Sequence, residues 1–484
     1  MSEREWGRLN PLMIVVRPLN ELLGLVPVLF ALLVLGDVDL IRLGIAVGTV
    51  VLVVLYGLLS WLTTKYRITE TRVELHKGVL FRQQLSIPRD RVRTVDLTAK
   101  LGHRLFGLSA VRVGTGKQEA KGEGVSLDAV TAAEADRLRQ EFLRRAPEAE
   151  AEAAAAEENQ LSTLDTAWYR YAPLTLSGLI GFGAVVGFGA NLASELDLGL
   201  SDSSAARSLS SWVTTSSAAT VVLVCAAVVL AFSTIASLIG YLLQNHAYRL
   251  TRQADGTLRV RRGLLTTRSV SVEEQKLRGV VRHEPLLLRL GGGARLSTVT
   301  TGLANESGSA LLLPAAPAAE ATRVTDEVLG STVDIPLARH PRRALPRRLV
   351  RAVAPSVLAV LVLAGLSSVA SWPAWLWVTA AVVLVPASAL VAFDRYRGLG
   401  HGLTPRYLVS RSGSLNRSTV ALERTGIIGW KVRRTFFQRR AGLITVTATT
   451  AAGAGGYEVV DVGEAQGLTL ADKAVPGLLR QFLA

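Results

Sequence analysis

The chain has 484 residues, of which 49% are hydrophobic and only 19% are charged. This balance excludes an ordinary soluble enzyme and is typical of a membrane protein with several domains. The single cysteine, Cys225, excludes a disulfide framework and a thiolate metal cluster. The net charge of +15 also fits a nucleic-acid-binding protein, so its distribution along the chain has to distinguish the two classes.

Residues 1–62 are predicted to form a hairpin of two transmembrane helices. Leu19–Leu35 and Leu43–Leu62 are apolar, and about 20 such residues can cross a bilayer. The second run ends near Trp61, and basic residues follow it at Lys65 and Arg67, as is typical of a helix that leaves the membrane.

A strand-rich module follows at residues 63–146. Its last segment, Thr131–Arg145, has the apolar spacing of an amphipathic helix. Residues 147–166 are rich in alanine and glutamate and are predicted to be an acidic linker. The module is thus expected to be a small β-domain held directly beside the membrane.

The same order of segments then occurs twice more. Residues 167–244 hold a second hairpin, with spans at Pro173–Leu192 and Val213–Leu243 and a polar loop between them, and a second module covers 245–331. Residues 332–393 hold a basic linker and a third hairpin, with spans at Ala352–Ser371 and Ala374–Phe393. The third module, 394–484, ends in a predicted helix at Ala471–Leu483. The prediction is six spans and three modules.

Glycines at matching positions support an internal repeat. A turn glycine stands early in each module, at Gly78, Gly263 and Gly413. Nine residues later the three modules have Ile87, Val272 and Leu422, and fourteen residues later they have Val92, Leu277 and Ile427. Apolar positions at fixed offsets from a turn glycine indicate one strand–turn–strand unit used three times.

The positive charge is concentrated on one side of the predicted spans. Of the 54 lysines and arginines, only Arg42 and Arg207 lie in the three outer connections. Because basic residues resist translocation, the modules and both termini are predicted to be cytoplasmic. Anionic lipid headgroups are then the expected counter-charge, and nucleic acid is not an expected partner.

Several short motifs in the first module resemble those of a known family. They are Arg8-Leu9-Asn10-Pro11-Leu12, Lys65-Tyr66-Arg67-Ile68-Thr69, Gly78-Val79-Leu80, Ser86-Ile87-Pro88 and Arg104-Leu105-Phe106-Gly107-Leu108. Together with the three-module layout they resemble bacterial membrane proteins with pleckstrin-homology-like domains of the YdbS/YdbT type. The resemblance implies an α+β fold in which each hairpin is followed by a bent β-sandwich or barrel with a C-terminal helix. It implies a bacterial plasma membrane location and brings no established activity.

The densest basic run lies immediately before the third hairpin. We predict that this run, together with Lys65 and Arg67, contacts anionic lipid headgroups; its members are Arg339, Arg342, Arg343, Arg347, Arg348 and Arg351. Gly183 and Gly187 form a G-x-x-x-G motif and are predicted to pack against another helix. The six histidines are scattered, so no metal site, catalytic residue or cofactor is predicted.

The leading hypothesis is a non-enzymatic platform that presents three modules at the bilayer to anionic lipid or to a membrane partner. By the resemblance, a single-module relative is one candidate partner, and self-association is the other. The alternative is a transporter or channel-like component built from the six spans. The glycines of the third span and Pro355 are the features in favour, and Glu21 near the start of the first span is the carboxylate whose substitution would test it.

Overall fold

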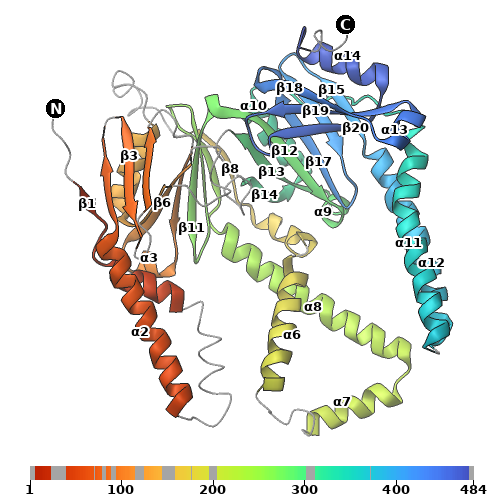
Figure 1. Cartoon of the computed structure of the whole chain (residues 1–484), viewed down its shortest axis with the longest axis horizontal. Helices are drawn as coiled ribbons and strands as arrows, with labels where there is room; N and C mark the ends of the chain where they lie inside the picture. The colour runs from red at the N-terminus through yellow and green to blue at the C-terminus, as the bar shows by residue number, and fades with distance from the viewer. Residues whose placement is uncertain are drawn as a thin grey trace. The chain divides into compact units, whose positions relative to one another are not determined.

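The computed structural model describes residues 6–22, 40–69, 71–78, 83–88, 94–114, 125–143, 159–175, 177–195, 204–300, 311–370 and 372–478. Long apolar helices are combined with antiparallel sheets (Figure 1). The chain divides into two compact units, Met1–Glu274 and Gln275–Ala484, which are called unit 1 and unit 2.

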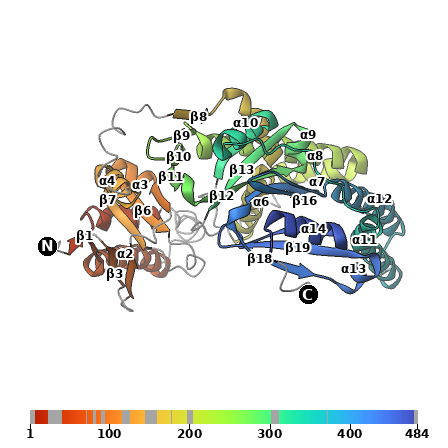
Figure 2. The same cartoon turned by 90° about the horizontal axis from the view of Figure 1, so that it is seen from above.

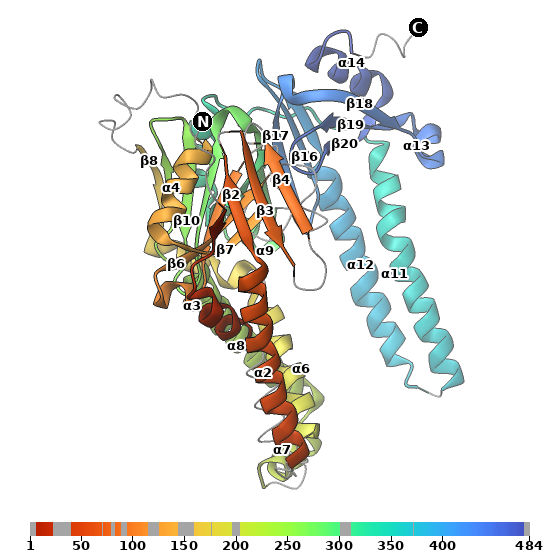
Figure 3. The same ribbon diagram turned by 60° about the vertical axis from the view of Figure 1, so that its left-hand side comes forward.

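Four helices in the described part of the chain are long and apolar enough to cross a membrane. They are α2 (Leu40–Thr63), α8 (Ala218–Asn245), α11 (Ala344–Val369) and α12 (Trp375–Arg397). In unit 2, α11 and α12 lie side by side (Figure 3). Each of the four overlaps a predicted span. The predicted span Leu19–Leu35 falls largely outside the described residues, although residues 13–22 are helical.

The region of the second predicted hairpin differs from the prediction. Helix α6 (Ser177–Glu195) covers the glycine-rich segment but is not one of the four apolar helices. The prediction of a polar loop before the next span is wrong over its last part, which forms helix α7 (Ser204–Thr215). Helix α8 begins only at Ala218, because the Ser217 hydroxyl accepts a hydrogen bond from the Thr220 N–H at 3.2 Å and caps the helix. The apolar run Val213–Leu243 is therefore divided between two helices.

Unit 1 contains a β-sandwich whose core joins two sheets. Buried side chains of both sheets, among them Val73, Leu75, Val111 and Leu127, form one core with Leu138 of α4 (Ala132–Leu143). One sheet has the strand order β1-β2-β3-β4, and the other has the order β7-β6-β5-β11-β10-β9-β8. The strands are β1 (Gly7–Arg8), β2 (Lys65–Ile68), β3 (Arg72–Lys77), β4 (Gln83–Pro88), β5 (Thr94–Ala99), β6 (Leu108–Gly114), β7 (Val125–Thr131), β8 (Asn159–Thr163), β9 (Arg249–Arg252), β10 (Thr257–Arg262) and β11 (Thr267–Glu273). Short helices α3 (Leu101–Leu105), η4 (Thr166–Tyr171) and η5 (Pro173–Thr175) complete the unit.

Unit 2 repeats this arrangement with a six-stranded and a three-stranded sheet. The orders are β14-β13-β12-β17-β16-β15 and β18-β19-β20. Val281, Leu422, Ile444 and Val459 are among the side chains that bring both sheets into one core with Leu470. The strands are β12 (Leu277–Pro285), β13 (Gly293–Thr300), β14 (Leu311–Pro317), β15 (Gly400–Leu403), β16 (Tyr407–Ser412), β17 (Asn416–Glu423), β18 (Ile427–Arg433), β19 (Leu443–Thr450) and β20 (Gly456–Gly463). Besides α11 and α12, the helices are η7 (Glu274–Lys276), α9 (Leu286–Leu290), α10 (Ala318–Leu329), η8 (Arg424–Gly426), α13 (Phe436–Ala441) and α14 (Glu464–Ala474). The final helix begins before the predicted Ala471–Leu483 and ends at Ala474, and residues 479–483 of that prediction lie outside the described residues.

The predicted modules are not separate sheets, because strands of neighbouring modules pair directly. In unit 1, β5 of the first module pairs antiparallel with β11 of the second. In unit 2, β12 of the second module pairs antiparallel with β17 of the third. The second half of one module and the first half of the next therefore form one continuous sheet, which sequence analysis did not predict.

The three predicted turn glycines all have the left-handed backbone that favours glycine. Their φ angles are 124° at Gly78, 110° at Gly263 and 100° at Gly413. A Cβ at Gly263 would lie 2.1 Å from the Thr266 carbonyl oxygen, and one at Gly413 would lie 2.2 Å from that of Asn416. Only glycine fits these tight turns, which accounts for the spacing found in the sequence.

Candidate functional site

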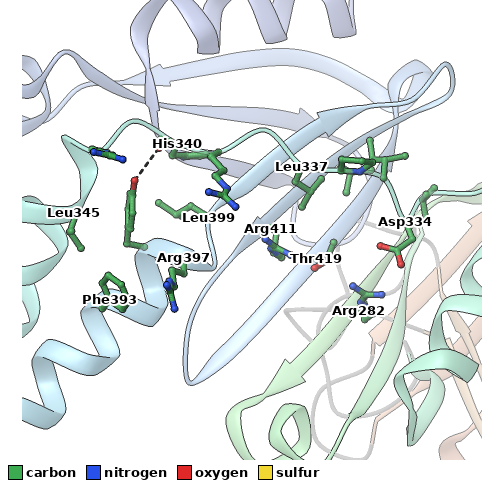
Figure 4. A pocket seen from close by; sticks show the side chains of 17 residues that line it. Arg282, Asp334, Leu337, His340, Leu345, Phe393, Arg397, Leu399, Arg411 and Thr419 are labelled. Atoms are coloured by element: carbon green, nitrogen blue, oxygen red, sulfur yellow. Dashed lines mark hydrogen bonds between the residues drawn. The ribbon is translucent and has the colours of Figure 1, made fainter.

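A pocket of about 790 Å³ lies in unit 2, where the two apolar helices meet the sheet (Figure 4). The extended segment 333–342 forms one wall, and residues of β12, β16 and β17 form the other. Leu345 of α11 and Phe393 of α12 line the end nearest the apolar helices. The pocket therefore joins a surface made by the β-domain to the ends of two candidate membrane spans.

The charged groups of the pocket are nearly all arginines. Five line it, namely Arg282, Arg339, Arg342, Arg397 and Arg411, and Asp334 is the acidic residue among the lining groups. Figure 4 shows Arg397, Arg411 and Arg282 arranged in this order from helix α12 towards strand β12. Because a guanidinium group is planar and always charged, this lining is suited to binding an anion such as a phosphate.

Two of the inner arginines are partly buried and already have partners in the protein: Arg411 Nε donates a hydrogen bond to the Gly398 carbonyl at 3.2 Å, and Arg282 Nε lies 3.8 Å from a carboxylate oxygen of Glu284. Burial, together with the nearby Arg417 and Arg282, lowers the pKa of Arg411, against the opposing effect of Glu284 and Asp334. The Nη1 atom of Arg282 donates a hydrogen bond to the Thr322 hydroxyl at 3.2 Å, but its buried Nε atom has no hydrogen-bond partner in the described part of the chain. An anion in the pocket would reduce the repulsion among these groups.

The two arginines of the extended wall are open to solvent. Arg339 and Arg342 are both exposed, and neither guanidinium has a salt-bridge partner among the residues described. Arg397 lies over the ring of Phe393, with its guanidinium carbon 4.6 Å from the ring centre. The site thus has arginines on both walls and an aromatic and aliphatic end, a combination that fits an amphiphilic ligand.

A buried pair of histidines, His340 of the extended wall and His401 of strand β15, stabilises this wall. The His340 Nε2 and His401 Nδ1 atoms lie 3.0 Å apart, and His340 Nδ1 lies 3.2 Å from the backbone carbonyl of Asp461. Burial and the neighbouring His401 lower the pKa of His340 to about 4, and burial lowers the pKa of His401. The pair is therefore neutral at pH 7 and acts as a fixed hydrogen-bonded support.

Beside the pocket, a buried carboxylate attaches helix α11 to strand β20. Asp461 is fully buried, and its Oδ2 atom accepts a hydrogen bond from Arg348 Nε at 2.8 Å. Its Oδ1 atom accepts hydrogen bonds from Arg347 and from the Gln438 side-chain amide, the latter at 2.8 Å. This network fixes the start of α11, and with it the arginine-bearing segment before the helix, against the β-domain.

Comparison with known proteins identifies the fold family. A family model described as "Bacterial PH domain" matches residues 22–146, 204–332 and 349–473, which together are most of the chain. The chain belongs to the bacterial PH domain family. Its three matches confirm the internal repeat, and each covers a strand-rich module of the bacterial PH domain type with apolar sequence before it.

One curated relative has a similar length. The UPF0699 transmembrane protein YdbT of Bacillus subtilis (strain 168) is 23% identical over 427 residues, which are 84% of this chain and 84% of the relative. No solved structure matches the chain. The protein is therefore a membrane protein with repeated bacterial PH domains, similar to YdbT.

The structure separates the residues predicted to contact lipid into groups with different surroundings. Arg339 and Arg342 line the pocket, while Arg347 and Arg348 form ion pairs with Asp461. Arg343 and Arg351 are exposed. Lipid contact by any of these residues stays a prediction, but for Arg347 and Arg348 the bacterial PH domain supplies a carboxylate partner of its own.

In unit 1 the two predicted basic residues after helix α2 also differ. Lys65 is exposed on β2. The Arg67 guanidinium pairs with Glu74 at 2.8 Å and lies over the ring of Trp6. Lys65 is thus available to a headgroup, whereas Arg67 already has two partners within the bacterial PH domain.

The close approach of helices α6 and α8 occurs at a glycine outside the predicted motif. A Cβ at Gly178 would lie 1.8 Å from the Ser233 carbonyl oxygen, and the Gly178 N–H donates a hydrogen bond to the Ser237 hydroxyl at 2.8 Å. A Cβ at Gly183 or Gly187 would meet no described heavy atom within 4 Å. Packing at Gly183 and Gly187 remains a prediction, and Gly178 is where the described helices approach closely.

Arg282, Arg411 and Asp461 were not among the site residues predicted from the sequence. The two arginines lie on strands where a charged side chain most often points to solvent, and only the fold brings them beside residues 333–342. Asp461 had a usable signal, because it is an isolated carboxylate within the apolar run Val459–Val462. A charge at such a position requires a partner, and the basic run before α11 supplies it. In the described residues no group of three histidine, cysteine, aspartate or glutamate side chains could hold a metal ion.

Proposed function

We propose that this protein is a non-enzymatic membrane platform whose PH domains hold anionic phospholipid at the bilayer surface. The observation that carries the proposal is the arginine-lined pocket of about 790 Å³ beside the ends of α11 and α12. A phosphate group there would accept charge-assisted hydrogen bonds from several guanidinium groups. The apolar end of the pocket, at Leu345 and Phe393, is then in position to contact the glycerol and the first part of the acyl chains.

The chemistry of the lining favours binding over catalysis. Guanidinium groups stay protonated and cannot exchange protons as general acids or bases at neutral pH. His340, the histidine of the lining, is buried with both ring nitrogens near hydrogen-bonding partners. The proposal therefore assigns the pocket a recognition role and no reaction.

The charge distribution of the sequence supports a location on the inner face of the membrane. Only Arg42 and Arg207 of the 54 basic residues lie in the predicted outer connections, so we propose six spans with all three modules and both termini in the cytoplasm. In this arrangement the pocket faces the leaflet in which anionic lipid is abundant. The other predicted lipid contacts, Lys65, Arg343 and Arg351, would add weaker interactions with the same surface.

The proposal is tested by binding of soluble phospholipid to the purified full-length protein in non-ionic detergent. The probe is dihexanoyl phosphatidylglycerol, compared with dihexanoyl phosphatidylcholine and with inorganic phosphate. The double substitution Arg339→Gln with Arg342→Gln is expected to weaken phosphatidylglycerol binding about tenfold or more, since each charge-assisted hydrogen bond contributes about 1.5–3 kcal/mol. The matched control is Arg439→Gln with Arg440→Gln, which removes the same charge from exposed positions of unit 2 outside the pocket.

Each outcome of this titration has a definite meaning. Loss of binding in the pocket variant, with the control unchanged, supports the proposal. Equal weakening in both variants would mean that net charge alone explains the effect, and it would contradict binding of the lipid in the pocket. Equal affinity for phosphatidylcholine would contradict anion recognition, and tight binding of phosphate alone would replace a lipid by a free anion as the ligand.

A further inference from the structure

Strands β4 and β18 each pair with a neighbour on one side only, within the part of the chain that the structure describes. β4 is the last strand of the four-stranded sheet and pairs with β3, as Figure 3 shows. β18 is the first strand of the three-stranded sheet and pairs with β19, as Figure 2 shows. Among the described strands, each therefore has an edge without a paired neighbour, which is a template for another strand.

The internal repeat identifies the kind of strand that each edge lacks. β4, β11 and β17 are equivalent strands of the three modules, and β5, β12 and β18 are the strands that follow them. β11 pairs with β5, and β17 pairs with β12. By the same rule β4 would pair with a strand of the β18 type, and β18 with a strand of the β4 type.

The two strand pairings between modules, β5 with β11 and β12 with β17, are called joints, and they have the same register. Thr94 lies opposite Val272 in one joint, and Gly279 lies opposite Leu422 in the other. In both, the first residue stands sixteen positions after the turn glycine of its module and the second stands nine positions after its own. The equivalent residues of the free edges are Gly429 and Ile87. Antiparallel pairing from there places Trp430 opposite Ser86, Lys431 opposite Leu85 and Val432 opposite Gln84.

At Gly429 of β18, the described residues leave room for a partner strand. A Cβ at Gly279 would lie 2.0 Å from the Ala421 carbonyl oxygen, because β17 runs alongside. A Cβ at the equivalent Gly429 meets no described heavy atom within 4 Å. Both strands have an irregularity in register just before this glycine, between Leu277 and Gly279 in β12 and between Ile427 and Gly429 in β18. Among the described strands, β18 thus resembles β12 but has no equivalent of β17 beside it.

The side chains of the two edges are compatible with pairing. Lys431 and Arg433 protect β18 against indiscriminate association, as charged residues do on many edge strands. Residues 83–87 of β4 contain no ionisable side chain, so these charges meet no like charge across the joint. Pro88, which lacks an N–H, lies beyond the last pair of the derived register.

We propose that β18 of one copy pairs antiparallel with β4 of a second copy, with Gly429 opposite Ile87. A second copy is the partner because every copy carries both edges in the required register. Copies held in the same membrane also meet at high effective concentration. The joint is heterologous, so copies connect head to tail into a chain or a closed ring. The surface is distinct from the arginine-lined pocket, and this inference does not depend on lipid binding.

The proposal is tested by disulfide cross-linking of the full chain in membranes, in a Cys225→Ser background that removes the single native cysteine. One tagged chain carries Val432→Cys and a differently tagged chain carries Gln84→Cys, so that only two different chains can be joined. Directly opposite residues have Cβ atoms about 4.5–5.5 Å apart, close to disulfide reach. The control replaces Val432→Cys by Ile428→Cys, at an exposed position on the same strand and about 13 Å farther along it.

We expect a product containing both tags with Val432→Cys and its loss with Ile428→Cys. A chain carrying both Val432→Cys and Gln84→Cys is expected to give a ladder of dimers and larger products. Absence of the two-tag product would overturn the proposal, as would equal yield from the control. A cross-link confined to single double-cysteine chains would overturn it as well, because the two edges would then belong to one molecule.

Discussion

The buried Asp461 network allows a quantitative test of what holds helix α11 to its β-domain. In Asp461→Asn the shape of the side chain is kept and its charge is removed. Asparagine also tolerates the left-handed backbone at this position, where φ is 58°. Arg347 and Arg348, whose side chains are 11% and 5% exposed, then lose their carboxylate.

The expected loss follows from the burial of the three groups. Removing one partner of a buried ion pair costs about 3–5 kcal/mol, because the remaining charge is left uncompensated. For a unit of this size about 3 kcal/mol corresponds to a fall in Tm of about 6–12 °C. The matched control is Glu464→Gln, which breaks the Arg434–Glu464 pair at side-chain exposures of 40% and 45%. An exposed pair contributes about 0–1 kcal/mol, so the Tm of the Glu464→Gln variant is expected to change little.

The assay is thermal unfolding of the full-length protein in detergent, followed by tryptophan fluorescence. A double-mutant cycle with Arg348→Met measures the coupling, because a pair in direct contact gives a combined loss smaller than the sum of the single losses. Equal and small effects of Asp461→Asn and Glu464→Gln would refute the assignment of a buried anchor. Strict additivity with Arg348→Met would refute the direct contact.

Three further predictions concern other parts of the molecule. Burial holds the pKa of His340 and of His283 at about 4 in the folded state. Their unfolded pKa is about 6.5. The unfolded state therefore binds protons first, and the free energy of unfolding is expected to fall between pH 6.5 and pH 4, with a smaller fall in His340→Gln. Gly178→Ala is expected to destabilise the α6–α8 contact by about 1–3 kcal/mol, and Gly183→Ala by much less; equal Tm values would contradict the packing. Gly279→Ala is expected to lower the Tm through its clash with the Ala421 carbonyl, whereas Gly429→Ala leaves the Tm of the detergent-solubilised monomer unchanged.

The sequence predicted the features that depend on local physics. Four of the six predicted spans overlap apolar helices that are long enough to cross a membrane, because length and hydropathy alone determine whether a segment can do so. The turn glycines Gly78, Gly263 and Gly413 were identified from spacing, and each has a positive φ. The boundaries of α8 and α14 were less accurate; for α8 the reason is that a capping serine, rather than hydropathy, determines where the helix begins.

The pairing of strands between modules could not be predicted in the same way. The alternation of apolar residues in β11 and β17 specifies a strand with one buried face, but it does not specify which strand lies beside it. The partner is determined by the path of the chain between modules. The same limitation applies to the pocket, since Arg282 and Arg411 are separated by more than a hundred residues and meet only because β12 pairs with β17 and β17 with β16.

The pocket and the Asp461 anchor share one stretch of chain, which has a consequence for binding. Residues 339–348 supply Arg339 and Arg342 to the pocket and Arg347 and Arg348 to Asp461. In the same stretch, His340 Nδ1 lies 3.2 Å from the Asp461 carbonyl oxygen. The wall of the pocket is therefore held by a buried network before any ligand arrives. A ligand that binds groups already fixed in place does not have to order them, so less of the interaction energy is lost to entropy. Weakening the anchor with Asp461→Asn is accordingly expected to lower the affinity of the pocket for phosphatidylglycerol, although Asp461 is not among the pocket's lining residues.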